Sequence, residues 1–219
     1  MPDPIVVEPT ANHDASVIWM HGLGASAHDF ADMPRIISRP STRWIFPNAP
    51  VRPVTLNNGW RMPSWFDIRH LAGESDDERE CPVEAQESSE IITALIEAEH
   101  ARGIPYNRIV LVGFSQGGAM SLYTGCRFSQ RIAGMVCMSG YLIFPEVHMD
   151  ASHPTNRDTP ILVCHGTRDD MVPFSSGQRT VEFLRENGWG VDFEHYPMFH
   201  EVCMSEIRRV EEFFSEVLD

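Results

Sequence analysis

The sequence contains no lysine, because all 17 of its basic residues are arginine. These 17 are outnumbered by 31 aspartates and glutamates, which gives the chain a formal net charge of −14. A protein that binds the phosphate backbone of nucleic acid needs clustered cations. The charge balance therefore argues against a nucleic-acid partner.

The sequence also lacks paired cysteines. Its five cysteines are odd in number and scattered, with no C-x-x-C spacing: Cys81, Cys126, Cys137, Cys164 and Cys203. This pattern predicts neither a disulfide framework nor a zinc site, and it fits reduced thiols in a cytoplasmic protein. The pair His200-Glu201 does not extend to H-E-x-x-H, so we expect no metal.

Long hydrophobic runs are absent as well. No stretch approaches the roughly 18 continuous apolar residues of a membrane span. The start, Met1-Pro2-Asp3-Pro4, has no cationic segment of the kind that opens a signal peptide. We expect a soluble, unsecreted protein with no membrane span, folded as a single domain over residues 1–219, a usual length for one α/β domain.

Short apolar runs are present, and several of them end at a glycine. Continuous apolarity without alternation is typical of strands buried on both faces, and helical segments lie between the runs. The sequence therefore predicts an α/β protein with a mostly parallel central sheet and helices on both faces. The predicted strands are 16–20, 43–46, 109–112, 132–138, 161–164 and 191–196.

Helix signals occupy the segments between these strands. Ser26 with Asp29 resembles a capping box and predicts a helix to about Ile37. Pro82 suits the first turn of a long helix that closes at Gly103. Further helices are predicted at 116–127, 175–187 and 204–218.

Residues 47–80 are the least regular part of the sequence. They carry several prolines, an Asn57-Asn58-Gly59 turn and the aromatic residues Trp60, Trp65 and Phe66. Long irregular segments inside compact domains are often functional loops. The aromatics would form either an apolar wall over a site or ordinary core packing, and the sequence leaves both open.

The first functional motif is G-x-S-x-G, with Ser115 between Gly113 and Gly117. It follows the apolar run 109–112 and precedes a predicted helix, which favours a turn that exposes a nucleophilic serine at the end of a strand. The motif alone is weak, since a few per cent of chains this long contain it by chance. A functional serine would also need a base, an acid and an oxyanion site.

A base and an acid are available after later strands. Reactive groups gather at the carboxyl ends of parallel strands, and His200 lies in the turn between the last strand and the last helix. Asp169 and Asp170 lie in the loop after strand 161–164, and their spacing does not separate them. The order serine, aspartate, histidine is the one expected for α/β hydrolases.

An oxyanion site is predicted from backbone N–H groups. This fold takes one donor from the residue after the nucleophile, here Gln116, and a second from an early strand-to-helix loop. The loop His21-Gly22-Leu23-Gly24 fits, and we assign the second donor to Leu23. Neither G-x-x-x-x-G-K-[ST] nor G-x-G-x-x-G occurs, which disfavours nucleotide binding.

Five longer segments make the sequence similar to a known family. They are HGLGASAHDF from His21, RPVTLNNGWRMPSWFDI from Arg52, RIVLVGFSQGGAMSLYTG from Arg108, HGTRDDMVP from His165 and YPMFHEV from Tyr196. With them the chain resembles, nearly end to end, the phospholipase/carboxylesterase group of α/β hydrolases. That group includes bacterial carboxylesterases and eukaryotic acyl-protein thioesterases.

The resemblance implies several properties. It selects Asp169 as the acid, because the aspartate of the HGxxDxxVP motif lies four residues before the proline. It also implies the α/β-hydrolase fold without a large lid domain, no cofactor, an apolar acyl channel beside the serine and frequent homodimers. Two departures are Ala27 and Phe199, which replace common glycines. The ring of Phe199 is expected to narrow the acyl pocket.

We therefore expect a serine carboxylesterase that hydrolyses esters, and also thioesters, of short to medium acyl chains through Ser115, His200 and Asp169. Its substrate would be a small molecule, or an acylated lipid or protein. The alternatives are acyl-protein thioesterase or lysophospholipase action, and, from another class, a non-catalytic acyl-binding module. The expected substrate-binding residues are Trp65, Leu71, Met171, Val172 and Phe199.

Overall fold

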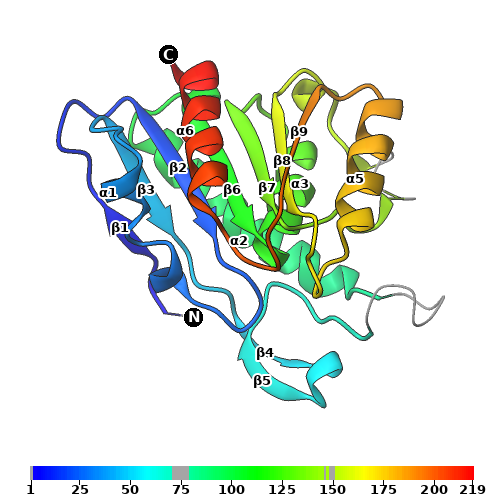
Figure 1. The fold of residues 1–219 in the computed structure, drawn as a ribbon. Coiled ribbons are helices and arrows are strands. Elements are labelled where there is room, and N and C mark those ends of the chain that lie inside the picture. Colours follow the sequence, from blue (N-terminus) through cyan, green and yellow to red (C-terminus); the bar gives the residue numbers. More distant parts are fainter. Residues whose placement is uncertain (1, 71–78, 146, 148–150) are drawn as a thin grey trace.

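The computed structural model of the protein describes residues 2–70, 79–145, 147 and 151–219. Within them a seven-stranded sheet has the order β1-β3-β2-β6-β7-β8-β9 (Figure 1). Neighbouring strands are parallel except for the antiparallel edge pair β1–β3. The strands are β1 (Ile5–Val7), β2 (Ala15–Met20), β3 (Thr42–Phe46), β6 (Ile109–Phe114), β7 (Gly134–Met138), β8 (Ile161–Gly166) and β9 (Val191–Tyr196).

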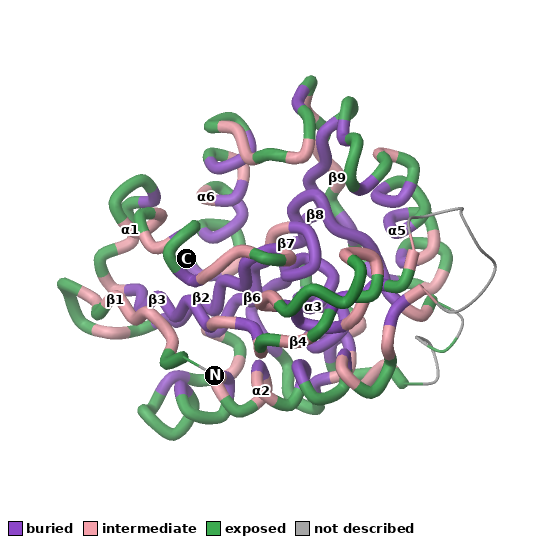
Figure 2. The backbone as a smooth tube through the Cα atoms, turned by 90° about the horizontal axis from the view of Figure 1, so that it is seen from below, coloured by how far each residue is buried: buried purple, intermediate pink, exposed green. Residues whose placement is uncertain are grey.

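The central strands are buried on both faces, as their continuous apolarity predicts. Along β2, Val17 and Trp19 belong to one hydrophobic cluster, whereas Ile18 and Met20 belong to the other. Figure 2 shows the buried strands running through the middle of the molecule, with exposed segments around them. A sheet of this kind needs a cover on each side.

Helices cover both faces of the sheet. The helix α6 (Met204–Leu218) and the short α1 (Met33–Ile36) pack on one cluster. The helices α2 (Pro82–Ala101), α3 (Gln116–Arg127) and α5 (Phe174–Glu186) pack on the other. The predicted α/β-hydrolase architecture is confirmed. No helix in the described residues is both long enough and apolar enough to cross a membrane.

The helix predicted from Ser26 to about Ile37 is wrong as one element. The chain forms a 3-10 turn, η1 (Ala27–Asp29), and then α1 after a break at Phe30. A continuous helix would put Pro34 in its third turn, where its ring clashes with the preceding turn and no N–H can donate. In α1 the same proline occupies the first turn, which tolerates it.

Residues 47–80 contain a hairpin that was not predicted from the sequence. The strands β4 (Val51–Val54) and β5 (Trp60–Pro63) pair antiparallel through the 3-10 turn η2 (Thr55–Asn57), and Asn58 takes a left-handed conformation with φ 54°. Pro53 and Pro63 hide this strand signal, because proline cannot donate to a ladder. The hairpin projects beyond the carboxyl ends of the sheet strands (Figure 1).

The register of the sheet brings the strand ends together. Met20 is paired with Gly113, Phe114 with Met138 and Gly166 with Tyr196. The loops that follow β2, β6, β8 and β9 therefore meet at one edge of the sheet. The remaining 3-10 turns of the described residues, η3 (Tyr106–Arg108) and η4 (Pro154–Asn156), precede β6 and β8 in the chain.

Candidate active site

Ser115 occupies the turn between β6 and α3 with φ 56° and ψ −120°. A residue other than glycine rarely takes a positive φ, so the surrounding structure must hold it there. Its N–H donates to the Met138 carbonyl at 2.8 Å. A Cβ at Gly113 would overlap the backbone of Gly117, so strand and helix cross too closely for any larger residue at Gly113. The turn lifts the Ser115 side chain out of the sheet edge.

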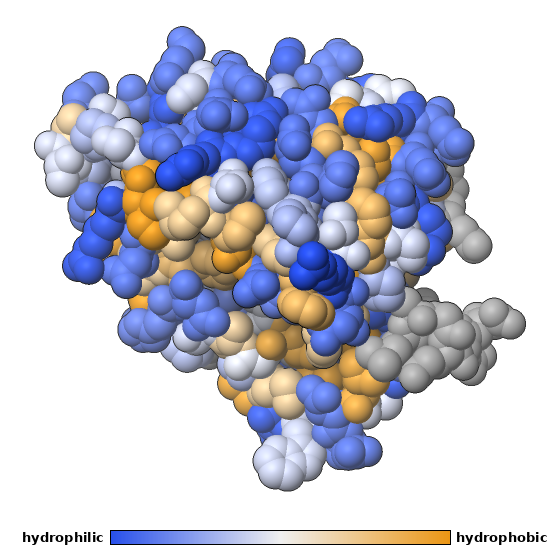
Figure 3. All heavy atoms as spheres, in the orientation of Figure 1, coloured by the Kyte–Doolittle hydropathy of each residue, from blue (hydrophilic) through white to orange (hydrophobic). Residues whose placement is uncertain are grey.

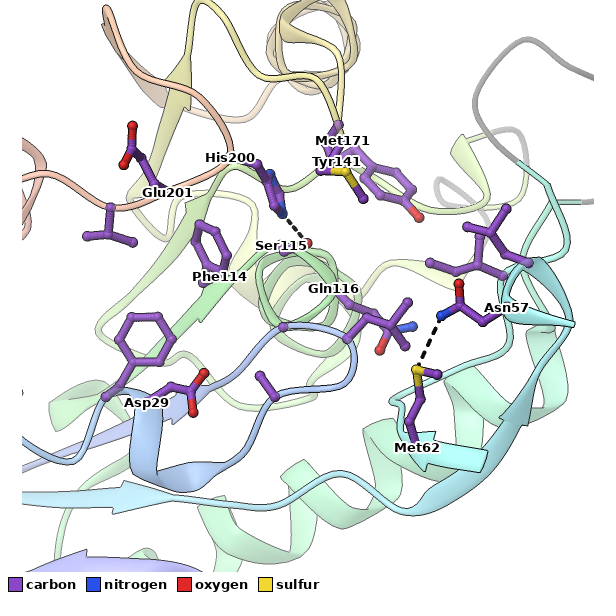
Figure 4. Close-up of a pocket in the computed structure, with 18 of the residues that line it drawn as sticks. Asp29, Asn57, Met62, Phe114, Ser115, Gln116, Tyr141, Met171, His200 and Glu201 are labelled. Carbon is purple, nitrogen blue, oxygen red and sulfur yellow. Dashed lines mark hydrogen bonds between the residues drawn. The ribbon is translucent and has the colours of Figure 1, made fainter. Parts of the chain in front are cut away.

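His200 connects the serine to Asp169. Its Nε2 lies 2.9 Å from the Ser115 Oγ (Figure 4). Its Nδ1 lies 2.7 Å from the Asp169 Oδ2. The imidazole ring also packs on Phe114, with 4.8 Å between the ring centroids. The structure thus brings together the three residues predicted from the sequence as nucleophile, base and acid.

Asp169 is held as a carboxylate by the donors around it. Its Oδ1 accepts hydrogen bonds from the backbone N–H groups of Met171 and Val172, at 3.0 and 2.8 Å. Burial acts to raise the pKa of Asp169, but the hydrogen bonds from His200 and Val172 outweigh it and hold the pKa below its usual value. The neighbouring Asp170 is exposed. Of the two candidate acids, Asp169 is the one that contacts His200.

A second histidine supports the loop that carries the carboxylate. His165, fully buried in β8, has its Nε2 2.9 Å from the Val172 carbonyl oxygen and 3.5 Å from the Asp169 Oδ2. Burial lowers its pKa, so the ring is favoured in its neutral form. His165 precedes Asp169 in the sequence and does not contact Ser115 in the structure. Its contacts are with the Asp169 loop.

The two predicted oxyanion donors line the same cavity as the serine. A Cβ on Gly22 would lie 3.3 Å from the Ser115 Cβ, so the loop that carries Leu23 packs directly on Ser115. Among the described residues, the backbone N–H groups of Leu23 and Gln116 donate to no acceptor. Both remain available to a developing negative charge on a substrate oxygen.

His21 fixes the loop before Leu23. Its Nε2 accepts a hydrogen bond from the Ala49 N–H at 3.0 Å, so the proton is on Nδ1, which donates to the Gly22 carbonyl at 2.7 Å. Burial lowers the pKa of His21, which favours this neutral form. The indole Nε1 of Trp65 donates to the His21 carbonyl at 2.8 Å.

The side chain of Gln116 ties Trp65 to the nucleophile turn. Its Oε1 accepts from the Trp65 N–H at 2.8 Å, and its Nε2 donates to the Phe66 carbonyl at 2.6 Å. The sequence suggested only a backbone role for Gln116. No local signal could have revealed the second role, because the partners lie 50 and 51 residues away in the chain.

Ser115 opens on a cavity of about 530 Å³, a usual size for a small-molecule site. Asp29, Phe114 and Glu201 lie on one side of the serine, and Tyr141 and Met171 on the other (Figure 4). The apolar lining also includes Phe30, Leu56, Met62, Ile68, Val172 and Val202. Met171 and Val172 line the cavity, as expected of substrate-binding residues. Figure 3 shows apolar surface where the β4–β5 hairpin joins the body of the protein.

Two expected substrate-binding residues lie elsewhere. Trp65 is fully buried and does not line the cavity. Its indole packs against the His21 loop, because its Nε1 donates to the His21 carbonyl. Phe199 is 53% exposed and also lies outside the lining, so its ring does not narrow the cavity. In this turn its carbonyl packs against Gly166. Leu71 lies outside the described residues.

No group of three or more histidine, cysteine, aspartate or glutamate side chains in the described segments is arranged to hold a metal ion.

A mostly parallel sheet with a serine at the turn after its middle strand is the arrangement of an α/β hydrolase. Comparison with known proteins places this chain among the serine hydrolases. The chain belongs to the phospholipase/carboxylesterase family, whose model matches residues 1–218.

Similar proteins support this membership over nearly the whole chain. Acyl-protein thioesterase 1 of Cryptococcus neoformans is 38% identical, covering 97% of this chain and 96% of its own. The Neurospora crassa protein of the same name is 36% identical, covering 98% and 91%. The crystal structure of Zea mays acyl-protein thioesterase 2 superposes with a TM-score of 0.90 at 27% identity, covering all of both chains. Arabidopsis thaliana SOBER1 gives 0.87 at 31%, covering 94% and 100%.

Proposed function

We propose that the protein is a carboxylesterase that hydrolyses carboxylic esters, and acyl thioesters, of short to medium acyl chains through an acyl-enzyme on Ser115. One observation carries the proposal: the chain of hydrogen bonds from Ser115 through His200 to Asp169, with distances of 2.9 and 2.7 Å, opens on an apolar cavity.

In the first step His200 Nε2 takes the proton of Ser115 as Oγ attacks the carbonyl carbon. The charge that develops on the carbonyl oxygen is stabilised by the N–H groups of Leu23 and Gln116. Asp169 keeps the His200 proton on Nδ1 and stabilises the imidazolium. Nε2 then protonates the departing alkoxide or thiolate, which leaves the acyl group on Ser115.

In the second step water attacks the acyl-enzyme carbonyl, and His200 Nε2 removes its proton. The tetrahedral intermediate uses the same two backbone donors, and its collapse returns the proton to the Ser115 Oγ. Carboxylic acid is released and no cofactor takes part. One oxyanion donor is typically worth about 2.7 to 4 kcal/mol, so the backbone groups matter about as much as the side chains.

Acyl-protein thioesterase action is the second candidate, favoured by the names of the relatives. Thioesters react through the same steps, and thiolate is the better leaving group. The physiological substrate is a small ester or thioester, or an acylated lipid or protein. The five cysteines are free, which supports a cytoplasmic location as part of the proposal.

The test is hydrolysis of p-nitrophenyl butyrate and a matched butyryl thioester. We expect Ser115→Ala and His200→Ala to lower kcat by about 10³-fold or more, since the removal of a triad member leaves only oxyanion and binding contributions. Asp169→Asn should also lose most activity. Asp170→Asn is the matched control, because it neutralises the adjacent exposed carboxylate, and it should retain wild-type turnover. Wild-type turnover by Ser115→Ala would overturn the proposal, as would equal losses in the two aspartate variants.

A further inference from the structure

A second cavity of about 350 Å³ adjoins the catalytic cavity. Arg79 and Tyr141 line both, so they form the junction between the two spaces. Tyr141 is the second residue after Ser139, at the end of β7, and a Cβ on Gly140 would lie 2.8 Å from the Ser115 carbonyl oxygen. The junction therefore begins beside the Ser115 turn.

Arginine side chains dominate the charge of this second cavity. Arg179, on α5, is exposed at its rim and donates to the Ser176 Oγ at 3.0 Å. Arg79 stands at the junction, with its guanidinium 4.6 Å from the centre of the Tyr141 ring and its Nε donating to the His70 carbonyl at 3.1 Å. These contacts hold one cation where the two cavities meet.

Among the described residues, Glu80 is the one carboxylate that lines the second cavity, and it does not cancel both cations. Glu80 lies 3.6 Å from Arg79, and burial raises the pKa of Glu80, which weakens its charge. No acidic side chain of the described residues lies within ion-pair distance of Arg179. Of the described side chains that line the cavity, two are cations and one is a carboxylate, so they leave an excess of positive charge in a chain whose net charge is −14. Such a local reversal of sign favours an anionic ligand.

The opposite side of Ser115 has the opposite charge. Asp29 and Glu201 lie on the Phe114 side of the serine, away from Tyr141 (Figure 4). A substrate with an anionic group would be repelled from that side and attracted toward the arginines. The charges therefore define how such a substrate lies across the serine.

We propose that this second cavity, which we name the arginine annex (Arg79, Tyr141, Ser176 and Arg179), binds a carboxylate or phosphate group carried by the ester or thioester substrate. Guanidinium groups pair well with both anions, since they present donors in a planar fork. The inference rests on the proposed function and adds a substrate class to it. The anion belongs either to the acyl group or to the leaving group.

The experiment compares three p-nitrophenyl-type esters in two pairs. For the acyl side, 4-nitrophenyl hydrogen adipate is paired with 4-nitrophenyl hexanoate. For the leaving-group side, 3-carboxy-4-nitrophenyl hexanoate is paired with the same neutral ester. For each pair, the kcat/KM of the anionic ester is divided by the kcat/KM of the neutral ester. The ratio for each variant is then divided by the wild-type ratio, because this step cancels intrinsic differences in ester reactivity.

We expect Arg179→Gln to lower the ratio about 5- to 10-fold for one of the two pairs, and Arg79→Gln to lower the same ratio at least as much. The pair that responds identifies the half of the substrate that carries the anion. In Arg179→Gln the neutral ester should keep its kcat/KM within about 2-fold, because Arg179 does not line the catalytic cavity. Raised salt should reduce the wild-type ratio.

Arg208→Gln is the matched control, since it removes one exposed positive charge from α6, outside both cavities. It should leave both ratios unchanged. The proposal would be overturned if, for both pairs, Arg179→Gln gave the same ratio as the wild type. It would also be overturned if Arg208→Gln lowered a ratio as much as Arg179→Gln does. Arg179 is exposed, so this variant keeps the test decisive if Arg79→Gln misfolds. Hydrolysis of the neutral ester reports separately on the proposed function.

Discussion

At the scale of single residues, Ser115 combines a strained backbone with a fully engaged side chain. Its φ of 56° directs Oγ toward His200, and the hydrogen bond from its N–H to Met138 fixes the turn. The strain costs on the order of 1 to 3 kcal/mol, which the packing of the neighbouring strands offsets. The proposed nucleophile is therefore placed before any substrate binds.

Trp65 holds the loop that carries the proposed oxyanion donor Leu23. Replacement by phenylalanine keeps most of the volume but removes the donor to the His21 carbonyl. We expect Trp65→Phe to lower kcat about 10-fold with little change in KM, because the Leu23 N–H would lose its fixed direction toward the oxyanion. The measurement is steady-state hydrolysis of p-nitrophenyl butyrate.

Trp60→Phe is the control for this prediction, since Trp60 is exposed on the hairpin and lines neither cavity. It should behave as wild type. If Trp65→Phe keeps the wild-type kcat, or raises KM alone, the indole does not position the oxyanion loop.

The sequence predicted which residues meet at the candidate site better than it predicted the residues that support them. Ser115, His200 and Asp169 follow strands whose carboxyl ends meet, so topology and motif together predicted that they lie close. Trp65 was expected to contact substrate, because nothing local tells where an indole N–H finds its acceptor. Its acceptor, the His21 carbonyl, lies 44 residues earlier in the chain.

At the scale of secondary-structure elements, the crossing of α3 over the end of β2 depends on Gly117. A Cβ there would overlap the carbonyl oxygen of Met20 and would lie 2.7 Å from that of His21. Alanine is the better helix former, so propensity alone would make Gly117→Ala stabilising. The overlap with rigid backbone outweighs this helix propensity, so we expect Gly117→Ala to destabilise the fold.

We expect Gly117→Ala to lower the free energy of unfolding by about 3 kcal/mol or more, and Tm by roughly 10 °C. Gly190→Ala is the matched control, because a Cβ at Gly190 meets nothing within 4 Å. Thermal unfolding followed by circular dichroism checks both. Equal Tm values for the two variants would contradict the packing described here.

Helix α6 carries an ionisable group into the core. Glu206 is fully buried in its first turn, and burial raises the pKa of this carboxyl from 4.5 to about 8, an effect that the backbone of Cys203 only partly offsets. Between these two pH values the folded protein keeps a proton that the unfolded chain has released. Stability from this group is therefore complete below pH 4.5 and is lost as the pH rises toward 8.

We expect this group to cost the wild type roughly 3 to 5 kcal/mol across that pH range, and Glu206→Gln to remove the dependence. Urea unfolding of both proteins at pH 5, 6.5 and 8 gives the difference in their free energies of unfolding. The contributions of all other titrating groups cancel in this difference. The exposed Glu212→Gln on the same helix is the control and should parallel the wild type. A constant difference between wild type and Glu206→Gln would show that Glu206 does not titrate in this range.

The long elements were predictable, and the short ones were not. The helices α2, α3, α5 and α6 begin and end within about two residues of the predicted positions, since apolar periodicity and caps define them over many residues. The edge strand β1 spans three half-buried residues and gives no such pattern. The hairpin of β4 and β5 is masked by its prolines and stabilised by tertiary contacts.

At the scale of the whole molecule, one edge of the sheet gathers every group that the proposed reaction uses. The parallel order β2-β6-β7-β8-β9 places the Leu23 loop, the Ser115 turn, the Asp169 loop and the His200 turn side by side. The order of these strands could be expected from the fold class. The shape of the cavity could not, because it depends on the hairpin and on side chains such as Tyr141 and Met171 that come from distant segments.

The central claim is that Ser115 is the nucleophile, and covalent labelling tests it most directly. The protein is treated with a fluorophosphonate and digested with trypsin, which cuts this lysine-free chain only after arginine and releases Ser115 on the peptide 109–127. We predict one adduct per chain, located on Ser115 by fragmentation, absent in Ser115→Ala and slowed more than about 10²-fold in His200→Ala. An adduct on any other residue, or equal labelling of Ser115→Ala, would contradict the account.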